Sequence, residues 1–406
     1  MAKEMLATTT SGAIDWHDET TLDPTIQFRH PPTAFAQEPQ CIFLTGATGF
    51  LGAFLLDELL RTTRAEVICL VRHGEAESAA TKLQLHLQRL GLWNASFVHR
   101  IIPVRGDLSQ PLLGLPREQF ESLAERVDVI HHHAAQVDFL RPYRVLEATN
   151  VRGTQEVLRF AGTGRTKPLH HVSSLAVFFS QTYVEKGLVS EFDTPVLDAG
   201  INSGYAQSKW VAEQLVIAAR ERGLPVAIYR TARIAGHSCT GVTGNMQDLL
   251  NRLIWACVHL QACPTLTIEI AMVPVDYASR VIASLSTRER SLGRAFHLFH
   301  PQPISWPTLM GMIRSFGYPM TECSYDEWRV ALKRMATTSH PARDTLGRLW
   351  VALNAPNQLL TRRPQYETPN LQDGLEGTGI KCPPLDETLV RAYISFFQKC
   401  GHIPMP

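Results

Sequence analysis

The sequence lacks several features that would each point to a particular class of protein. It has no apolar run of the roughly 18 residues that cross a bilayer, and its first 20 residues lack the apolar core of a signal peptide. Its 39 Lys and Arg balance 38 Asp and Glu, so no net field attracts nucleic acid or an anionic membrane. Its eight cysteines are scattered without a CxxC pair, as is typical of thiols in a reducing compartment. We therefore expect a cytoplasmic protein with neither a nucleic-acid nor a membrane partner.

The chain also lacks internal repeats and low-complexity tracts; instead, short apolar runs alternate with helical patterns between Cys41 and about Arg230. The apolar runs are 41–45, 66–71, 100–104, 127–132, 169–174 and 225–230, and helical patterns include 52–62, 117–126 and 203–222. Strands that alternate with helices form βαβ units and a parallel sheet. The prediction is an α/β fold with a Rossmann-type, doubly wound parallel sheet.

The length of 406 residues predicts two domains. Residues 1–40 are polar and contain proline, and we interpret them as a lead-in. We assign 41–240 to the Rossmann domain, to which about 268–300 returns. Segments 241–267 and 301–406 are expected to form a smaller, mainly helical C-terminal domain that holds the substrate.

Three glycines follow the first predicted strand in "LTGATGFLGAFLLDELL" (44–60). Gly46 permits a tight turn, Gly49 lets a pyrophosphate approach the backbone, and Gly52 lets the helix pack closely on the strand. The helix N-terminus beyond them attracts negative charge. Their position after the first strand of a βαβ series predicts a dinucleotide site.

The end of the second predicted strand indicates which dinucleotide binds. An acidic residue there suits a free ribose hydroxyl, and a basic residue suits a 2′-phosphate. Here Arg72 occupies that position, and no Asp or Glu precedes Glu75, so we predict NADPH. Lys82 is either a second phosphate ligand or part of a solvated helix face, and Asp107 either lies against adenine or belongs to a turn.

The motif "SGYAQSKWVAEQL" (203–215) places Tyr205 and Lys209 on one face of a helix. We expect the lysine ammonium to lower the pKa of the phenol, so that Tyr205 protonates an oxygen that receives charge during hydride transfer. Ser174 ends a preceding strand, where its hydroxyl would hold the same oxygen. The prediction is a catalytic trio of Ser174, Tyr205 and Lys209.

These motifs, together with "GDLSQPLLGL", "HHAAQVDF", "HHVSSLAVF" and "VPVDYASRVIASLS", resemble those of extended short-chain dehydrogenase/reductases. More narrowly, the chain resembles the thioester reductase domains that terminate nonribosomal peptide and polyketide synthases, with carboxylic acid reductases as near relatives. "TTLDPTIQF" in the lead-in resembles the linker that follows a carrier domain.

The resemblance implies a role for each matching residue. It makes Ser174, Tyr205 and Lys209 catalytic, with Asn150 supporting the network at the sheet end. The residues that would bind NADPH are Thr45, Gly46, Thr48, Gly49, Phe50, Leu51, Gly52, Arg72, Lys82, Asp107, Leu108, Ala134, Ala135, Asn150, Tyr205, Lys209, Arg233 and Ile234. Family members often have Pro-Gly at Thr231-Ala232 and Asn-Gly near His133-Ala134, so seating of the nicotinamide here is expected to differ. No metal is expected.

The resemblance also implies the reaction and the partner. The substrate would be an acyl or peptidyl thioester on the phosphopantetheine arm of a carrier domain, and the chain would be a monomeric domain of a larger synthase. Hydride from NADPH would release an aldehyde, and a second NADPH could reduce the aldehyde to an alcohol. The alternatives are a redox-inactive cyclising domain, a sugar-nucleotide epimerase or dehydratase, and a non-enzymatic NADP-sensing protein.

Several other features have two interpretations. The tract His131–His133 could bind a metal, but successive strand residues point to opposite faces. Asp276 could touch substrate or cap a helix. Arg144, Arg152 and Arg159 could dock an acidic carrier domain or form a solvated helix face. Met246, Leu249, Leu250 and Leu253 could line an acyl channel or pack in the core.

Overall fold

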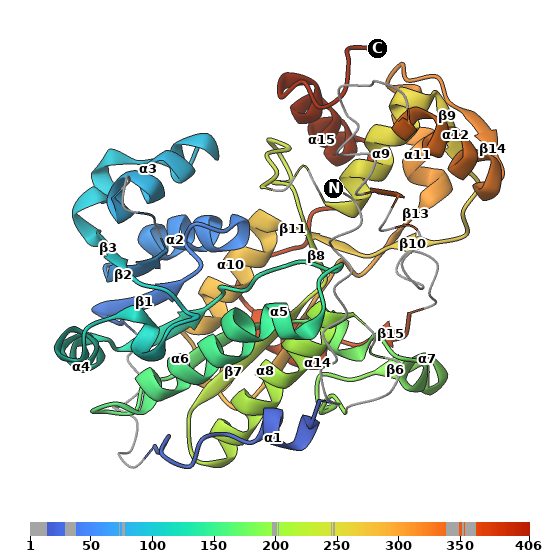
Figure 1. Cartoon of the computed structure of the whole chain (residues 1–406). Coiled ribbons are helices and arrows are strands. Elements are labelled where there is room, and N and C mark those ends of the chain that lie inside the picture. Colours follow the sequence, from blue (N-terminus) through green and yellow to red (C-terminus); the bar gives the residue numbers. More distant parts are fainter. Residues whose placement is uncertain are drawn as a thin grey trace.

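The computed structural model describes residues 14–28, 38–72, 74, 78–196, 201, 203–244, 246, 248–337, 349, 350, 353 and 363–406. Its centre is a parallel sheet of seven strands in the order β12-β7-β5-β4-β1-β2-β3 (Figure 1). The strands are β1 (Cys41–Thr45), β2 (Glu66–Val71), β3 (Ile101–Arg105), β4 (Val129–His132), β5 (Leu169–Ser174), β7 (Val226–Thr231) and β12 (Ala295–Leu298). The chain reverses its order beside β1, where parallel sheets bind ligands at their carboxyl ends. The predicted fold class is confirmed.

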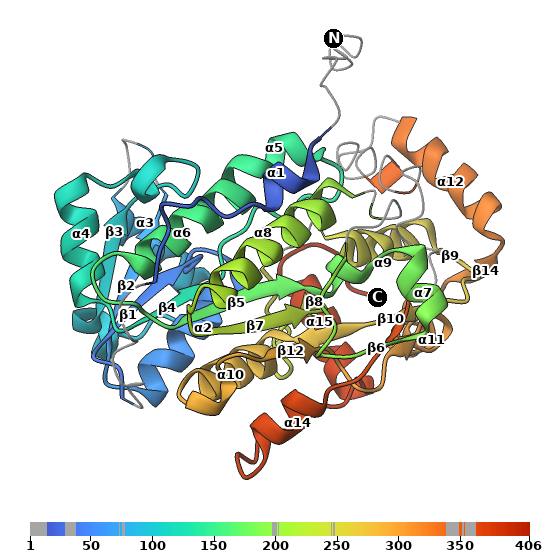
Figure 2. The same ribbon diagram turned by 90° about the horizontal axis from the view of Figure 1, so that it is seen from below.

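Helices cover both faces of the sheet (Figure 2). One face packs against α2 (Phe50–Thr62), α3 (Ala79–Arg89) and α10 (Val275–Ser286). The other packs against α4 (Arg117–Arg126), α5 (Tyr143–Glu147), α6 (Gly153–Gly162) and α8 (Gly204–Glu221). Every β1 residue is buried, as both-face coverage requires.

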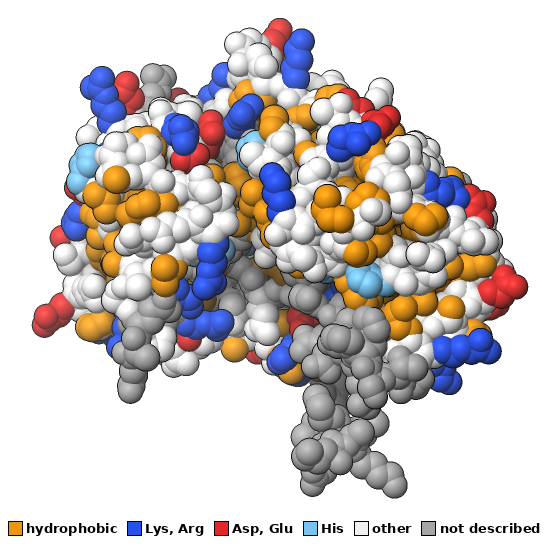
Figure 3. Space-filling model, turned by 90° about the horizontal axis from the view of Figure 1, so that it is seen from above, with side chains coloured by type: hydrophobic (Ala, Val, Ile, Leu, Met, Phe, Trp, Pro, Cys, Tyr) orange, Lys and Arg blue, Asp and Glu red, His pale blue; other side chains and the backbone are white. Residues whose placement is uncertain are grey.

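The C-terminal part contains a separate helical core, which we call the cap. Its helices are α9 (Leu249–Leu260), α11 (Trp306–Ser315), α12 (Tyr325–Thr337) and α15 (Glu387–Lys399). Short strand pairs join β9 (Ala262–Pro264) with β14 (Thr321–Cys323) and β10 (Glu269–Ile270) with β13 (Ile304–Ser305). Seen from above, the surface is hollowed between the sheet domain and the cap (Figure 3).

One segment inside the range 301–406 packs with the sheet domain rather than with the cap. Leu371 of α14 (Pro369–Leu375) lies in the apolar core of α2 and α10. The side-chain amide of Asn370 donates a hydrogen bond to the carbonyl oxygen of Ala295 in β12 at 3.0 Å. The adjacent β15 (Gln365–Tyr366) pairs with β6 (Leu188–Val189), which follows α7 (Gln181–Lys186). The apolar face of α14 is therefore buried against the sheet domain. The helical pattern in the sequence does not predict which domain this face packs against.

Residues 14–28 of the lead-in pack along the face of α6 and α8. Leu22 and Ile26 are buried in the core of that face, beside the short helix α1 (Trp16–Thr20). Arg222, at the end of α8, donates to the carbonyls of Leu22 and Ile26 at 2.8 and 3.1 Å. We call residues 14–28 the strap. Within the described part of the chain, no helix combines the length and apolar character of a membrane span.

Candidate active site

The turn between β1 and α2 is shaped by close backbone approaches that require glycine. Gly46 has φ +85°, and a Cβ there would lie 2.8 Å from Ala134 N. A Cβ on Gly52 would lie 2.1 Å from the carbonyl oxygen of Gly46. Thr48 lies in the turn, and Phe50 and Leu51 begin α2. This tight turn leads directly into a helix N-terminus, and its shape fits the pyrophosphate of a dinucleotide.

Thr45 joins the ends of β1 and β4 beside this turn. Its hydroxyl accepts hydrogen bonds from the amides of His133 and Ala134, both at 3.2 Å, and lies 2.8 Å from His132 Nδ1. These bonds bring Ala134 and the following Ala135 against the glycine turn. The structure therefore gathers the predicted phosphate-loop and ribose-side residues at the switch point of the sheet.

The residues predicted to contact the 2′-phosphate and the adenine follow β2 and β3 in the chain. Arg72 is exposed, and Lys82 Nζ donates to the carbonyl of Arg72 at 2.6 Å. Asp107 accepts two hydrogen bonds from Ser109 at 2.8 and 2.9 Å, so its carboxylate stabilises its own turn. Leu108 is buried against Gly153. The Lys82 ammonium thus lies at the backbone of Arg72, and contact of the two side chains with a 2′-phosphate stays a prediction.

The predicted catalytic trio meets where β5 ends and α8 begins. Tyr205 is in the first turn of α8, and its phenol lies close to the hydroxyl of Ser174, at the end of β5. Lys209 Nζ donates to the carbonyl of Val172 at 2.7 Å. The ring of Phe139 lies over Tyr205, with 4.7 Å between centroids, although Phe139 is 41% exposed. Tyr205 and Lys209 are both buried.

Burial controls the acidity of this pair in a way that the motif did not predict. The pKa of Tyr205 is raised to about 12 by burial, which the nearby hydroxyl of Ser174 only partly offsets. Burial lowers the pKa of Lys209 to about 8, against the opposing charge of Glu213. The expected lowering of the Tyr205 pKa is therefore wrong for the protein without cofactor, because desolvation of the phenolate dominates.

Asn150 links the segment after β4 to the start of α8, and its role in the network at the sheet end stays a prediction. It lies in a π-helical turn at 148–152, a geometry that often marks functional sites. Its side chain bonds both backbone groups of Gln136, at 2.7 and 3.1 Å, and donates to Ser208 Oγ at 2.9 Å. Ser208 in turn donates to the carbonyl of Tyr205 at 2.8 Å.

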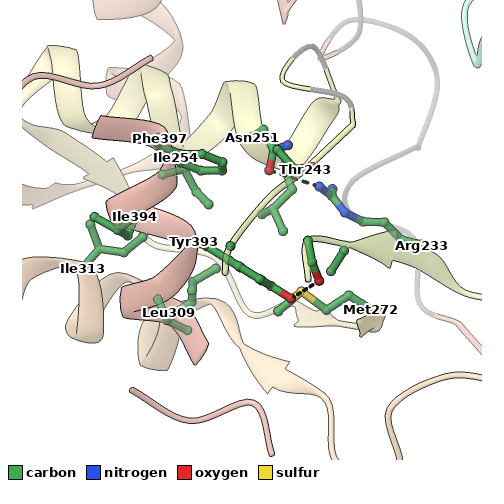
Figure 4. A pocket seen from close by; sticks show the side chains of 15 residues that line it. Arg233, Thr243, Asn251, Ile254, Met272, Leu309, Ile313, Tyr393, Ile394 and Phe397 are labelled. Carbon is green, nitrogen blue, oxygen red and sulfur yellow. Dashed lines mark hydrogen bonds between the residues drawn. The ribbon is translucent and has the colours of Figure 1, made fainter. Parts of the chain in front are cut away.

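Arg233 and Ile234 lie on β8 (Arg233–Ala235), which continues from β7 and pairs with β11 (Met272–Pro274). Arg233 forms an ion pair with Asp248 and donates to Asn251 at 3.3 Å. It borders a small, partly open cavity of about 30 Å³ between β8 and the cap helices. The cavity has a polar end at Arg233 and Asn251 and an apolar end (Figure 4). Leu250 lines it, and Leu253 packs in the cap core.

The three arginines Arg144, Arg152 and Arg159 are partly exposed, and each forms ion pairs within the chain. Arg144 and Arg152 form ion pairs with the buried Glu19 of the strap at 2.7 and 3.2 Å. Arg159 pairs with Asp23 of the strap at 2.7 Å. Glu147 and Glu156 on the same helical segment complete these ion pairs. A contact of this face with an acidic carrier domain stays a prediction.

Asp276 is not a helix N-cap. It lies in the first turn of α10, and its carboxylate accepts from the amide and hydroxyl of Ser238 at 2.8 and 2.7 Å. His131 and His132 are buried and face opposite sides of the sheet. In the described part of the chain, no cluster of three or more His, Cys, Asp or Glu has the geometry to hold a metal.

The motif analysis missed Glu213 and Arg230, which form an ion pair beneath the trio at 2.8 Å. Both side chains are almost inaccessible. The available signal was spacing: Glu213 lies four residues after Lys209, on the buried stripe that begins with Tyr205. A charged residue on an otherwise buried helix stripe requires a partner.

Comparison with known proteins gives a consistent picture. A profile of the NAD_binding_4 family, described as "Male sterility protein", matches residues 44–282. One of the proteins that make up the linear gramicidin synthase of Brevibacillus parabrevis is 38% identical over 389 residues, covering 95% of this chain but 8% of that protein. The chain therefore spans a small part of that synthase protein.

Two solved structures match over nearly their whole length. The terminal R domain of the myxalamid PKS-NRPS pathway is 38% identical with a TM-score of 0.90, covering 96% of this chain and 98% of that one. The reductase domain of a nonribosomal peptide synthetase from Mycobacterium tuberculosis is 25% identical with a TM-score of 0.74, covering 96% and 97%. These matches confirm the resemblance drawn from the motifs.

Proposed function

Because the chain belongs to the male sterility protein family and is an oxidoreductase related to terminal reductase domains, we propose that it reduces a carrier-bound thioester with NADPH. A nicotinamide dinucleotide is the cofactor of this family. The choice of NADPH is supported by Arg72 and Lys82 at the ribose edge and the absence of an acidic residue at the end of β2. The observation that carries the proposal is the proximity of the Ser174 hydroxyl, at the end of β5, to the Tyr205 phenol, in the first turn of α8.

The residues of the trio have distinct tasks in this reaction. When bound, NADPH supplies the hydride that reaches the thioester carbonyl carbon. Ser174 and Tyr205 donate hydrogen bonds to the carbonyl oxygen and stabilise its developing negative charge. The phenol, whose pKa is about 12, keeps its proton until that oxygen has become basic enough to take it. Lys209, with a pKa of about 8, then returns a proton to the tyrosine.

The product of this step is a hemithioacetal, which collapses to an aldehyde and the free pantetheine thiol. Burial of Tyr205 under Phe139 excludes water from the oxygen site in the absence of substrate. We propose that the thioester is delivered by a carrier domain of the same synthase, since the relatives are terminal domains of multidomain synthases.

The test is mass spectrometry of the product released from an acyl thioester of a carrier domain in the presence of NADPH. We expect an aldehyde, or its alcohol after a second reduction, with matching loss of NADPH fluorescence. A cyclised or hydrolysed product formed without oxidation of NADPH would contradict the proposal. Replacing NADPH by NADH tests the cofactor assignment separately, and we expect slower turnover.

A further inference from the structure

The ion pair of Glu213 and Arg230 is buried beneath the reaction centre. Glu213 Oε1 accepts from Arg230 Nε at 2.9 Å and from the terminal guanidinium nitrogen at 2.8 Å. The accessible fractions of the two side chains are 0% and 3%. Desolvating two charges costs several kcal/mol, so a buried pair is weak evidence of a stabilising role. Its position points to another role.

Glu213 connects α8 to the strand that carries Ser174. Its second carboxylate oxygen accepts from the hydroxyl of Ser173, and Ser173 is in register with Arg230 across β5 and β7. One turn earlier on α8, Lys209 donates to the carbonyl of Val172. Two side chains of one helix thus hold the two residues that precede Ser174.

We propose that Glu213 is a positioning residue, whose carboxylate, oriented by Arg230, fixes the end of β5 at Ser174 and holds the positive charge on Lys209. This inference rests on the proposed function. Glu213 contacts neither the substrate oxygen site nor the cofactor turn, so it acts through Ser173 and Lys209. The charge of Glu213 raises the pKa of Lys209, which burial lowers.

The other titratable groups that face Lys209 are neutral at working pH. From β4 and β5 these are His132, His133 and His171, whose pKa values burial and the nearby ammonium lower, that of His132 to about 3. On α8 itself, the pKa of Tyr205 is about 12. Glu213 is therefore the carboxylate that acts on the lysine.

Glu191 needs a separate control, because burial raises its pKa to about 7. It lies near Arg230 and accepts from the amides of His297 and Asn370. Its ionisation falls in the same pH range as that of Lys209 and would also affect a pH profile. Glu191→Gln removes this titration and leaves the Glu213 contacts with Ser173 and Arg230 in place.

The experiment measures kcat between pH 5.5 and 9.5 for the parent and for Glu213→Gln. Loss of the carboxylate leaves the ammonium of Lys209 unsupported, so we expect the alkaline limb to move about one pH unit lower. Near pH 6, where Lys209 keeps its proton, kcat should recover toward the parent value, while NADPH affinity stays within about twofold at every pH.

Two further variants separate geometry from charge. Ser173→Ala removes the hydrogen bond but no charge, so kcat should fall at all pH values while the alkaline limb stays in place. Replacing the pair by Glu213→Met with Arg230→Met fills the volume with apolar side chains, a change that folded proteins often tolerate. This double variant should keep the shifted limb even if Glu213→Gln alone fails to fold. Glu191→Gln should leave the limb where it is.

Superimposable pH profiles for the parent and both Glu213 variants would overturn the proposal. So would a loss of thermal stability and NADPH affinity with an unmoved limb, since that pattern marks a structural role. If the parent reduces no thioester, the proposed function fails instead. The effect of Glu213 on the charge of Lys209 is then measured by NMR titration of the Lys209 side chain. The pKa of Lys209 must be lower in Glu213→Gln than in the parent.

Discussion

The two faces of the central sheet bury different kinds of side chain. On the face of α2 and α10, the strand ends contribute Leu44, Leu298 and Phe296, and Tyr229 and His170 form a hydrogen bond at 2.9 Å. On the face of α6 and α8, the corresponding layer holds Thr45, His132, Ser173 and Arg230, facing Lys209 and Glu213. Buried polar groups cost free energy unless they are paired.

The face of α8 is therefore the one on which buried polar groups reduce stability and serve function. The α2 face supplies the glycine turn and stabilises the fold by apolar burial. The α8 face supplies proton-donating and charged groups, and each of Lys209 and Glu213 is matched with a partner from the sheet. The strap adds further ion pairs to this second face. Four predictions test the distinction.

The largest effect is expected from removing a phenol on the α8 face. Tyr205→Phe should lower kcat by about 10²–10⁴-fold, because the proton donor to the substrate oxygen is lost. NADPH affinity should stay nearly the same. Steady-state kinetics and fluorescence titration measure the two quantities.

The matched control is Tyr229→Phe on the α2 face, which removes the hydroxyl bonded to His170. We expect activity near the parent value and a loss of about 1 kcal/mol in stability. Activity of Tyr205→Phe within a few-fold of the parent would remove the catalytic assignment.

Both faces should contribute to a loss of stability at acidic pH. Burial lowers the pKa of His132 on one face and of His170 on the other to about 3. As pH falls below about 6.5, these histidines bind protons in the unfolded chain but not in the folded protein. The free energy of unfolding therefore falls by about 1.4 kcal/mol per pH unit for each histidine. The loss continues down to about pH 3, where the folded protein also binds the protons.

Urea unfolding at several pH values between 5 and 7 measures this slope. His170→Phe removes the contribution of the α2 face, so its slope should be smaller by about 1.4 kcal/mol per pH unit. Stability that is independent of pH in this range would show that the histidines are not buried as neutral groups.

Arg72 is an exposed cation, and its removal should affect cofactor affinity rather than catalysis or stability. Arg72→Ala should weaken NADPH by about 10–100-fold, because a charge-assisted contact with phosphate is lost. NADH affinity should change little. Arg89→Ala, at the exposed end of α3, is the control and should alter neither affinity. Equal weakening of both cofactors would mean that Arg72 does not contact the 2′-phosphate.

The smallest effect concerns the strap. Hydrogen bonds from Thr25 and Arg159 lower the pKa of Asp23 to about 2. A carboxylate with a lowered pKa stabilises the fold above its unfolded value near 4, and this contribution is lost as pH falls toward 2. Asp23→Asn should therefore cost about 1 kcal/mol at pH 7, after allowance for solvent screening, and less at pH 3. Asp18→Asn, exposed on α1, should change thermal stability little.

Much of the sheet was predictable from the sequence, since each predicted strand lies within two residues of an observed one. Short apolar runs mark buried parallel strands without reference to distant residues. The cap was predictable only as a helical region. Its packing, and the placement of α14 on the sheet domain, depend on which apolar faces meet.

The sequence alone determined the glycine turn, the Tyr205–Lys209 spacing and the cation at the ribose edge, because these are local patterns whose geometry follows from a strand, a turn or a helix. Only the tertiary structure decided the partners of Glu213, Arg230 and Glu19 and the raised pKa of Tyr205. Ion pairing and desolvation depend on which distant groups share a buried space, and neighbouring letters in a sequence carry no such information.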